Sequence, residues 1–394
     1  MGRGKNTSLM LGEESKNAVE EAEVISTGAR SKASRRETLA NSTFYVVLLV
    51  AVSNFVTYTV TKVSSARPAK FTGPGAAALA VVDPGLKEFH VVNAHEHLYK
   101  RSHLDKYLKA CKATGIERTL FVASSARTLM GSGFGIAEYN EKNSRDILNA
   151  AKEMPERIIP FCTLRPGDPG NLEKLKAYVA EGAKGLKLYS GHAQFYEKPL
   201  DTEEMLPIYA YCEESGLPIC WHVNMRLYGK EFRRVMARFP ELTVIIPHFG
   251  VTFYNPKGRS FRAFQELLDT YPNLYTDTSF GTRGILVNGL GMVSRHRDVF
   301  RAFFEKYSDR ILFGTDMVVT GNPEKTEGWI EAVLRACRDV LEKDTYYFYM
   351  AARGSNYALR GWPNPYGMLR GLALEDEILQ KVYETNAARL FPAE

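Results

Sequence analysis

The chain of 394 residues can bury a large core, and its 45% apolar and 24% charged residues are ordinary for a globular protein. The net charge of +6 is modest, and basic residues alternate with acidic ones, so the sequence gives no reason to expect nucleic acid as a partner. The five cysteines include no Cys-x-x-Cys pair, which favours buried apolar residues over a disulfide framework. We therefore expect one domain of catalytic size with appendages.

The N-terminal appendage has two parts. Residues 1–42 mix polar and charged residues without apolar periodicity, which predicts a disordered tail. Residues 43–63 carry no charge until Lys62, and about 20 such residues span a bilayer as a helix. Basic residues cluster just before this run, at Arg30, Lys32, Arg35 and Arg36, and fewer follow it closely. This asymmetry predicts a single-pass transmembrane anchor with a cytoplasmic tail and an extracytoplasmic domain.

A cleaved export signal is the main alternative to the anchor. Asn54, Thr57 and Thr59 weaken the second half of the span. The run 34–39 also resembles a twin-arginine export signal, although Thr38 replaces the usual aromatic residue. A buried soluble helix is the third possibility. Residues 64–86, which contain Pro68 and the Gly73-Pro74-Gly75 run, are predicted to form a linker to a domain at 87–394.

From residue 86 onward, short apolar runs alternate with amphipathic segments. We predict eight strands, near 89–95, 118–123, 157–163, 184–189, 218–222, 243–247, 273–278 and 310–314. Strands that are almost continuously apolar and alternate with helices indicate a parallel sheet covered on both faces. Eight such units predict an α/β fold of the (β/α)₈ TIM-barrel type rather than an open doubly wound sheet.

Helix signals separate these strands. Ser102-x-x-Asp105 opens one predicted helix that ends at Gly115, and a second runs from Asn171 to Gly182. A third, at 201–216, contains Pro207, which should kink the helix or shift its start.

Five potential metal ligands lie at the ends of predicted strands. His95 and His97 are two residues apart in a strand, so their side chains should share a face and could chelate one ion. His222, His248 and Asp316 end later apolar runs. In a barrel these ends converge on one mouth, where imidazoles and a carboxylate suit zinc or another first-row divalent ion.

These ordered motifs resemble the amidohydrolase superfamily, and the closing run Glu384–Phe391 resembles that of its amidohydrolase-related (amidohydrolase 2) branch. The resemblance covers roughly residues 88–393. It implies that His95, His97, His222 and Asp316 hold one divalent ion, expected to be zinc, which activates a water molecule. Asp316 would transfer protons, and His248 would orient the water or polarise the substrate.

The resemblance leaves two roles open. In binuclear relatives a lysine equivalent to Lys187 is carbamylated and bridges two ions, whereas we favour an unmodified Lys187 that contacts the site or the substrate. Asp277 either orients a ligand histidine or caps the chain locally.

Cationic and aromatic residues follow the strand ends and suit a planar or carboxylated small molecule: Arg165, Tyr189, Asn224, Arg226, Phe253 and Arg283. The run Arg353–Gly371 is expected to be an insertion over the mouth. We expect a metal-dependent hydrolase of a small amide, ester or lactone. The alternative is a non-oxidative decarboxylase or C–C hydratase of an aromatic or cyclic carboxylic acid at the same metal site. A non-catalytic binding barrel is the third possibility.

Overall fold

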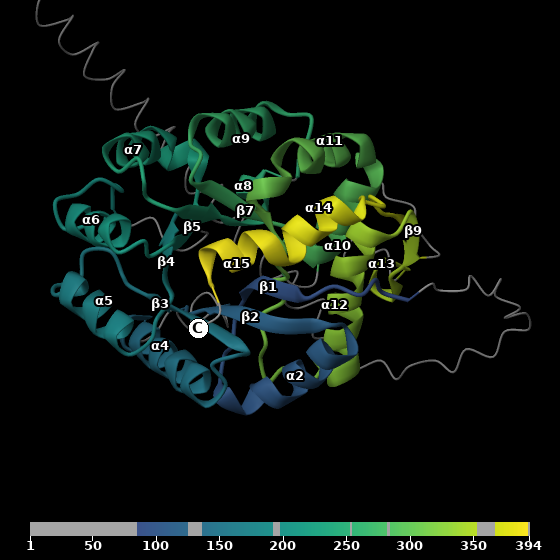
Figure 1. Cartoon of the computed structure of the whole chain (residues 1–394), viewed down its shortest axis with the longest axis horizontal. Helices are drawn as coiled ribbons and strands as arrows, with labels where there is room; N and C mark the ends of the chain where they lie inside the picture. Colours follow the sequence, from purple (N-terminus) through teal and green to yellow (C-terminus); the bar gives the residue numbers. More distant parts are fainter. Residues whose placement is uncertain are drawn as a thin grey trace, which may run out of the picture. The chain divides into compact units, whose positions relative to one another are not determined.

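The computed structural model describes residues 85–124, 136–191, 198–252, 254–281, 284–352 and 367–392 (Figure 1). The predicted tail, the transmembrane span and residues 64–84 of the predicted linker lie outside these residues, as do Phe253, Arg283 and residues 353–366 of the predicted insertion. Among the described residues, no helix combines the length and the apolar composition needed to span a bilayer. The anchor at 43–63 therefore stays a prediction.

Eight parallel strands form the sheet in the order β1 to β8, which confirms the predicted TIM-barrel fold. Each predicted strand is present with small shifts at its ends: β1 Val91–Glu96, β2 Ile116–Val122, β3 Ile158–Thr163, β4 Gly185–Ser190, β5 Ile219–Val223, β6 Val244–Ile246, β7 Leu274–Asp277 and β8 Ile311–Leu312. Backbone hydrogen bonds join the first strand to the end of the last. The Ala94 N–H donates to the Phe313 carbonyl at 2.7 Å, and the Asp316 N–H donates to the His95 carbonyl at 2.8 Å.

Helices follow the strands and surround the sheet (Figure 1). The longer ones are α2 Leu104–Ala113, α4 Ile136–Glu153, α5 Asn171–Ala180, α6 Leu206–Glu214, α7 Met225–Arg238, α9 Arg259–Thr270, α10 Gly284–Arg295, α11 Arg297–Tyr307 and α12 Glu327–Glu342. The short helices are η1 Arg101–His103, α8 Pro247–Val251, η2 Ser308–Arg310 and α13 Tyr349–Ala352. Pro207 lies in the first turn of α6, where its missing N–H costs no helical hydrogen bond. Of the two expected effects, a kink or a shifted helix start, the structure has the second: α6 begins at Leu206.

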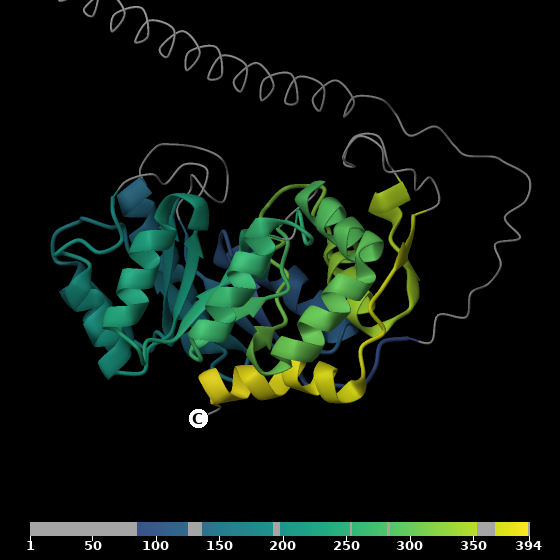
Figure 2. The same cartoon turned by 90° about the horizontal axis from the view of Figure 1, so that it is seen from above.

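The C-terminal segment closes one end of the barrel (Figure 2). It consists of α14 Asp376–Gln380, the π-helical turn η3 Lys381–Thr385 and α15 Asn386–Leu390. The Asn386 amide donates to the carbonyls of Ser308 and Ile311, just before and at the start of β8. The Phe391 ring packs edge-on against Phe161 at 5.6 Å. These contacts cover the N-terminal ends of the strands and leave the C-terminal ends for the site.

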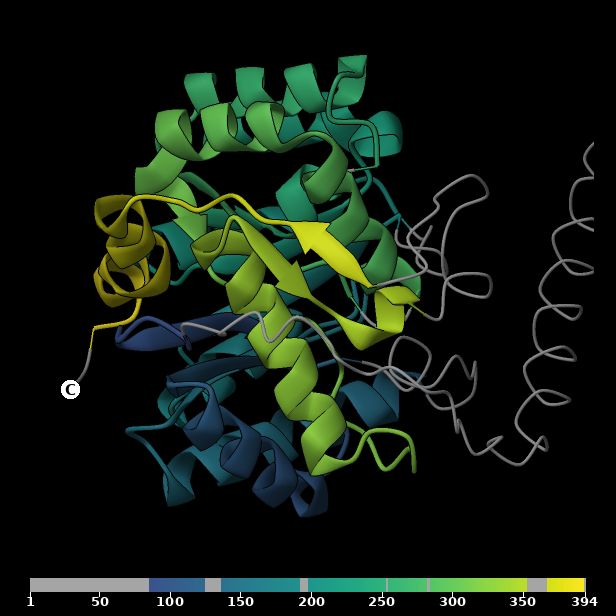
Figure 3. The ribbon, with the colours of Figure 1, turned by 90° about the vertical axis from the view of Figure 1, so that its right-hand side faces the viewer.

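A small second sheet lies beside the barrel (Figure 3). Its strands β9 Thr345–Tyr347 and β10 Met368–Arg370 pair antiparallel, next to α12 and α10. The second of these strands, β10, lies within the segment Arg353–Gly371 that the sequence indicates as an insertion.

Candidate metal centre

The end of β1 carries an irregularity that affects which way its side chains face. Pairing with β2 shifts between Asn93 and Glu96. Ala94, which strict alternation would place opposite the histidines, packs with interior residues such as Leu120 and Leu312. Such shifts re-aim side chains next to functional sites, and here His95 and His97 both come to face the mouth.

Three imidazole rings are fixed through their Nδ1 atoms. His95 Nδ1 lies 2.7 Å from Asp277 Oδ2, and His97 Nδ1 lies 2.7 Å from the Val122 carbonyl oxygen. His248 Nδ1 lies 2.8 Å from Ser279 Oγ. A carboxylate and a carbonyl only accept hydrogen bonds, so the Nδ1 atoms of His95 and His97 donate. Their Nε2 atoms then carry the lone pair that binds a metal.

The three Nε2 atoms converge on the carboxylate of Asp316. His97 Nε2 lies 3.5 Å and His95 Nε2 4.0 Å from Asp316 Oδ1, and His248 Nε2 lies 3.6 Å from Oδ2. Ligand atoms of His95, His248 and Asp316 all lie within 4.8 Å of one another. The rings of His95 and His248 are nearly stacked, with centroids 5.2 Å apart.

Two atoms at the centre of this group lack partners. His95 Nε2 and Asp316 Oδ1 are buried, and neither has a hydrogen-bond partner among the described residues. A buried polar atom left unpaired costs about 1–3 kcal/mol, more for a charged group. A divalent cation between the imidazoles and the carboxylate would satisfy both atoms, so the residues present fit a metal ion.

Burial sets the protonation of the site in the direction that metal binding needs. It lowers the pKa of His97 to about 3 and that of His248 to about 4, although the Asp316 charge raises both. Burial opposes ionisation of Asp316, but His95, His97, His248 and Lys187 lower the net pKa of this carboxyl below its ordinary value. Neutral imidazoles and an ionised carboxylate are the ligand forms.

Asp277 contacts a predicted ligand, the arrangement expected of a residue that orients a histidine. Its Oδ2 faces His95 Nδ1, while its Oδ1 accepts from the backbone N–H groups of His248 and Ser279, each at 3.0 Å. Burial opposes its ionisation, but the charge of His95 and its hydrogen bond lower the pKa of Asp277 below the usual range. One carboxylate therefore positions the imidazoles of two strands.

His248 sits on an unusual backbone. The φ angles of His248, Phe249, Gly250 and Val251 are 60°, 51°, 68° and 59°, so this turn after β6 is left-handed. Left-handed conformations cost non-glycine residues roughly 1–2 kcal/mol each and concentrate at functional sites. The Asp277 bond to the His248 N–H helps to hold this turn.

Glu96 holds the turn that presents Asp316, a role that the sequence did not indicate. Its Oε2 accepts from the Thr315 hydroxyl at 2.8 Å and from the Met317 N–H at 3.2 Å, and its Oε1 accepts from the Val318 N–H at 2.8 Å. Asp316 and Val318 have φ angles of 48° and 60°. Burial and then the Asp316 charge raise the pKa of Glu96 to about 7.

His222 and Lys187 border this group. His222, on β5, is half-buried, and its ring centroid lies 5.3 Å from that of His248. Lys187, on β4, is buried; its Nζ donates to Cys220 Sγ at 3.3 Å and lies 4.8 Å from the centre of the Tyr189 ring.

The two other predicted site residues lie at strand ends but have local roles. Asn224 caps α7, accepting from the Arg226 N–H at 3.2 Å and donating to the Gly191 carbonyl at 3.4 Å. The Arg165 carbonyl, after β3, accepts from Asn171 Nδ2 at 2.8 Å. Asn224 also lines the same cavity as His222.

Comparison with known families establishes the affiliation. The sequence profile described as Amidohydrolase matches residues 92–393, which is most of the chain and nearly the whole barrel. The chain belongs to the amidohydrolase family. This confirms the resemblance that the strand-end motifs indicated. Among functionally curated proteins, the comparison found no match to this amidohydrolase-family chain.

The comparison with solved structures found matches of low sequence identity. An uncharacterised TIM-barrel protein of Bordetella bronchiseptica is 15% identical, with a TM-score of 0.49 over 77% of this chain and 98% of its own. The 2,6-dihydroxybenzoate decarboxylase of Rhizobium is 16% identical, with a TM-score of 0.43 over 77% and 99%. The 4-oxalomesaconate hydratase of Rhodopseudomonas palustris is 17% identical, with a TM-score of 0.46 over 77% and 96%. Similarity at this level does not transfer a reaction, so the function has to be inferred from the residues of this chain.

Proposed function

We propose that this protein is a metal-dependent hydrolase of a small-molecule amide, ester or lactone. The observation that carries the proposal is the convergence of three buried imidazole Nε2 atoms on the carboxylate of Asp316, whose Oδ1 has no hydrogen-bond partner among the described residues, in a chain of the amidohydrolase family. His95, His97, His222 and Asp316 are the proposed ligands of one divalent ion, with zinc as the expected metal. Such an ion would polarise a carbonyl oxygen and make a coordinated water more acidic.

The residues of the chain would share the remaining work. Asp316, ionised and at the centre of the histidine group, is placed to accept a proton from the attacking water and to return it to the leaving group. His248 also faces the Asp316 carboxylate. His248 follows β6 and His97 follows β1, so the two histidines come from strands on opposite sides of β8, the strand that precedes Asp316. His248 Nε2 would stabilise negative charge on the substrate oxygen, and the fixed Nδ1 would keep that atom in place.

Lys187 is proposed as an unmodified cation of the site. Its Nζ is engaged with Cys220 and faces the Tyr189 ring, contacts that suit an ammonium group. Its positive charge lowers the pKa of Asp316, and so helps to keep this carboxylate ionised.

A non-oxidative decarboxylase or hydratase of a carboxylic acid is the second candidate. The specific observation in its favour is that three arginines line the cavity that reaches His222, since guanidinium groups bind carboxylates well. In that reaction Asp316 would deliver a proton to the substrate carbon from which carbon dioxide departs.

Turnover in ¹⁸O-labelled water separates the two candidates. After a screen of small esters, lactones, amides and carboxylic acids, hydrolysis would place one label in the carboxylate formed. Unlabelled product with release of carbon dioxide would refute the hydrolase and support the second candidate.

The ligand set needs its own experiment, because His248 lies as close to Asp316 as His97 does. Metal content should fall in His222→Ala and persist in His248→Ala, with activity lost in both. The opposite pattern would make His248 a ligand in place of His222.

A further inference from the structure

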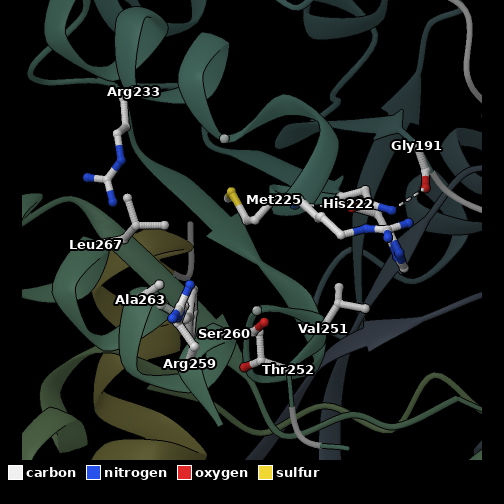
Figure 4. A pocket seen from close by; sticks show the side chains of 15 residues that line it. Gly191, His222, Met225, Arg233, Val251, Thr252, Arg259, Ser260, Ala263 and Leu267 are labelled. Carbon is white, nitrogen blue, oxygen red and sulfur yellow. Dashed lines mark hydrogen bonds between the residues drawn. The ribbon is translucent and has the colours of Figure 1, made fainter. Parts of the chain in front are cut away.

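A cavity of about 650 Å³ extends from the barrel mouth between two outer helices (Figure 4). Its walls come from the end of β5, from α7, from the turn after β6 and from α9. His222 and Gly191 lie at one side of this cavity, and Arg233, Arg259 and Leu267 lie at the other. Because the His222 ring is 5.3 Å from the His248 ring, the cavity begins at the proposed metal centre.

The charge of this cavity is strongly one-sided. Its lining includes Arg226, Arg233 and Arg259, and no acidic side chain among the described residues. Within the described part of the chain, none of these three guanidinium groups forms an ion pair, although their neighbours do find partners. Arg234 binds Asp201 with Nε at 2.6 Å, and Arg262 donates to the Lys257 carbonyl at 2.7 Å.

The spacing of the arginines implies a long ligand. Arg226 stands one residue into α7 and Arg233 two turns further, which at about 1.5 Å per residue separates them by roughly 10 Å along the helix axis. The lining also includes apolar side chains, with Met225 of α7 and Phe264 and Leu267 of α9. Arg259 and Ser260 belong to the first turn of α9, whose N–H groups favour negative charge.

We propose that this cavity is a second subsite, which binds an acidic group of the substrate remote from the reacting bond. The substrate class is then a small molecule with an apolar body and a carboxylate or phosphate held at Arg233, roughly 10 Å along the α7 axis from Arg226. Arg233 and Arg259 bind the remote anion from opposite walls, and Arg226 lies nearer to His222. This inference rests on the proposed function only for the group that reacts at the metal centre.

Binding of the full-length, metal-loaded protein to α,ω-dicarboxylic acids of increasing length tests the subsite. In calorimetry, diacids long enough to span the cavity should bind at least about tenfold more tightly than monoacids of equal length, because charge-assisted hydrogen bonds contribute about 1.5–3 kcal/mol. Arg233→Gln combined with Arg259→Gln should abolish this preference. Both side chains are exposed, so the thermal midpoint should not change.

The matched control is Arg234→Gln combined with Arg262→Gln, which alters the same helices outside the cavity. This double variant should keep the preference for diacids.

A separate titration with inorganic phosphate identifies the chemical class of the remote anion. Arginine-dependent binding of phosphate points to a phosphate ester, and arginine-dependent binding of diacids alone points to a carboxylate. The inference is overturned if neither binds, or if the control weakens binding as much as the double variant. Metal content and ¹⁸O incorporation report on the proposed function independently.

Discussion

Replacing Asp277 by Asn should weaken metal binding without unfolding the barrel. In the native chain, Oδ2 accepts from His95 Nδ1 at 2.7 Å, while Oδ1 accepts from two backbone N–H groups at 3.0 Å. An asparagine has only one acceptor oxygen. If that oxygen stays with the backbone, its NH₂ group faces His95 Nδ1, which must then accept; the ring proton moves to Nε2 and removes the lone pair needed for the metal.

The expected loss follows from this change of tautomer. Groups that orient metal-binding histidines typically contribute 10–100-fold to affinity, or about 1.4–2.7 kcal/mol. Competition with a chromophoric chelator measures the affinity of the wild type, of Asp277→Asn and of Asp269→Asn. Asp269 binds Lys306 at 2.9 Å at the surface, so its variant should bind metal like the wild type. Equal affinity of Asp277→Asn and the wild type would refute the reasoning.

Three further predictions concern other parts of the chain. Arg338→Met leaves Glu342 without the guanidinium that binds it at 2.6 Å in the interior, so the free energy of unfolding in urea should fall by about 3–5 kcal/mol. Arg335→Met, which removes the half-buried ion pair of Arg335 with Glu331, should change it by under about 1 kcal/mol; equal effects would contradict this. Lys187 should carry no carbon dioxide adduct, and added hydrogencarbonate should not raise metal content above one ion per chain; two ions would show the binuclear arrangement. The full chain should sediment with membranes and a protein beginning near Phe71 should not, while a mature N-terminus beyond residue 63 would indicate a cleaved signal.

The strands were predictable because most of their residues are buried on both faces and so form apolar runs that sequence patterns detect. His95 and His97 were predictable for the same reason, since they directly follow such a run. Pro207 is compatible with a kinked helix or with a later helix start, and the sequence does not distinguish them. The structure has the later start, at Leu206.

The supports of the site were not predictable from local patterns. Glu96 binds the turn at Thr315, which is 219 residues away, and no spacing rule connects them. Ser279 follows Asp277 closely, but its contact with His248 depends on the pairing of β6 and β7. The left-handed turn at 248–251 contains one glycine, Gly250. A single glycine is too weak a signal to predict positive φ angles at four consecutive residues.

The arginine cavity was predicted only in part. Arg226 follows β5 closely, so its position in the sequence indicates a residue of the mouth, whereas Arg233 lies two turns further into α7. It meets Arg259 across the cavity only because α7 and α9 are neighbours in the fold.

The central claim is that the histidines and Asp316 hold one divalent metal ion. Elemental analysis of the purified wild type and of His97→Ala, after dialysis against metal-free buffer, tests it most directly. We predict one equivalent of metal per chain in the wild type and almost none in a folded His97→Ala. A wild type without metal, or a His97→Ala protein with its full complement, would contradict the assignment.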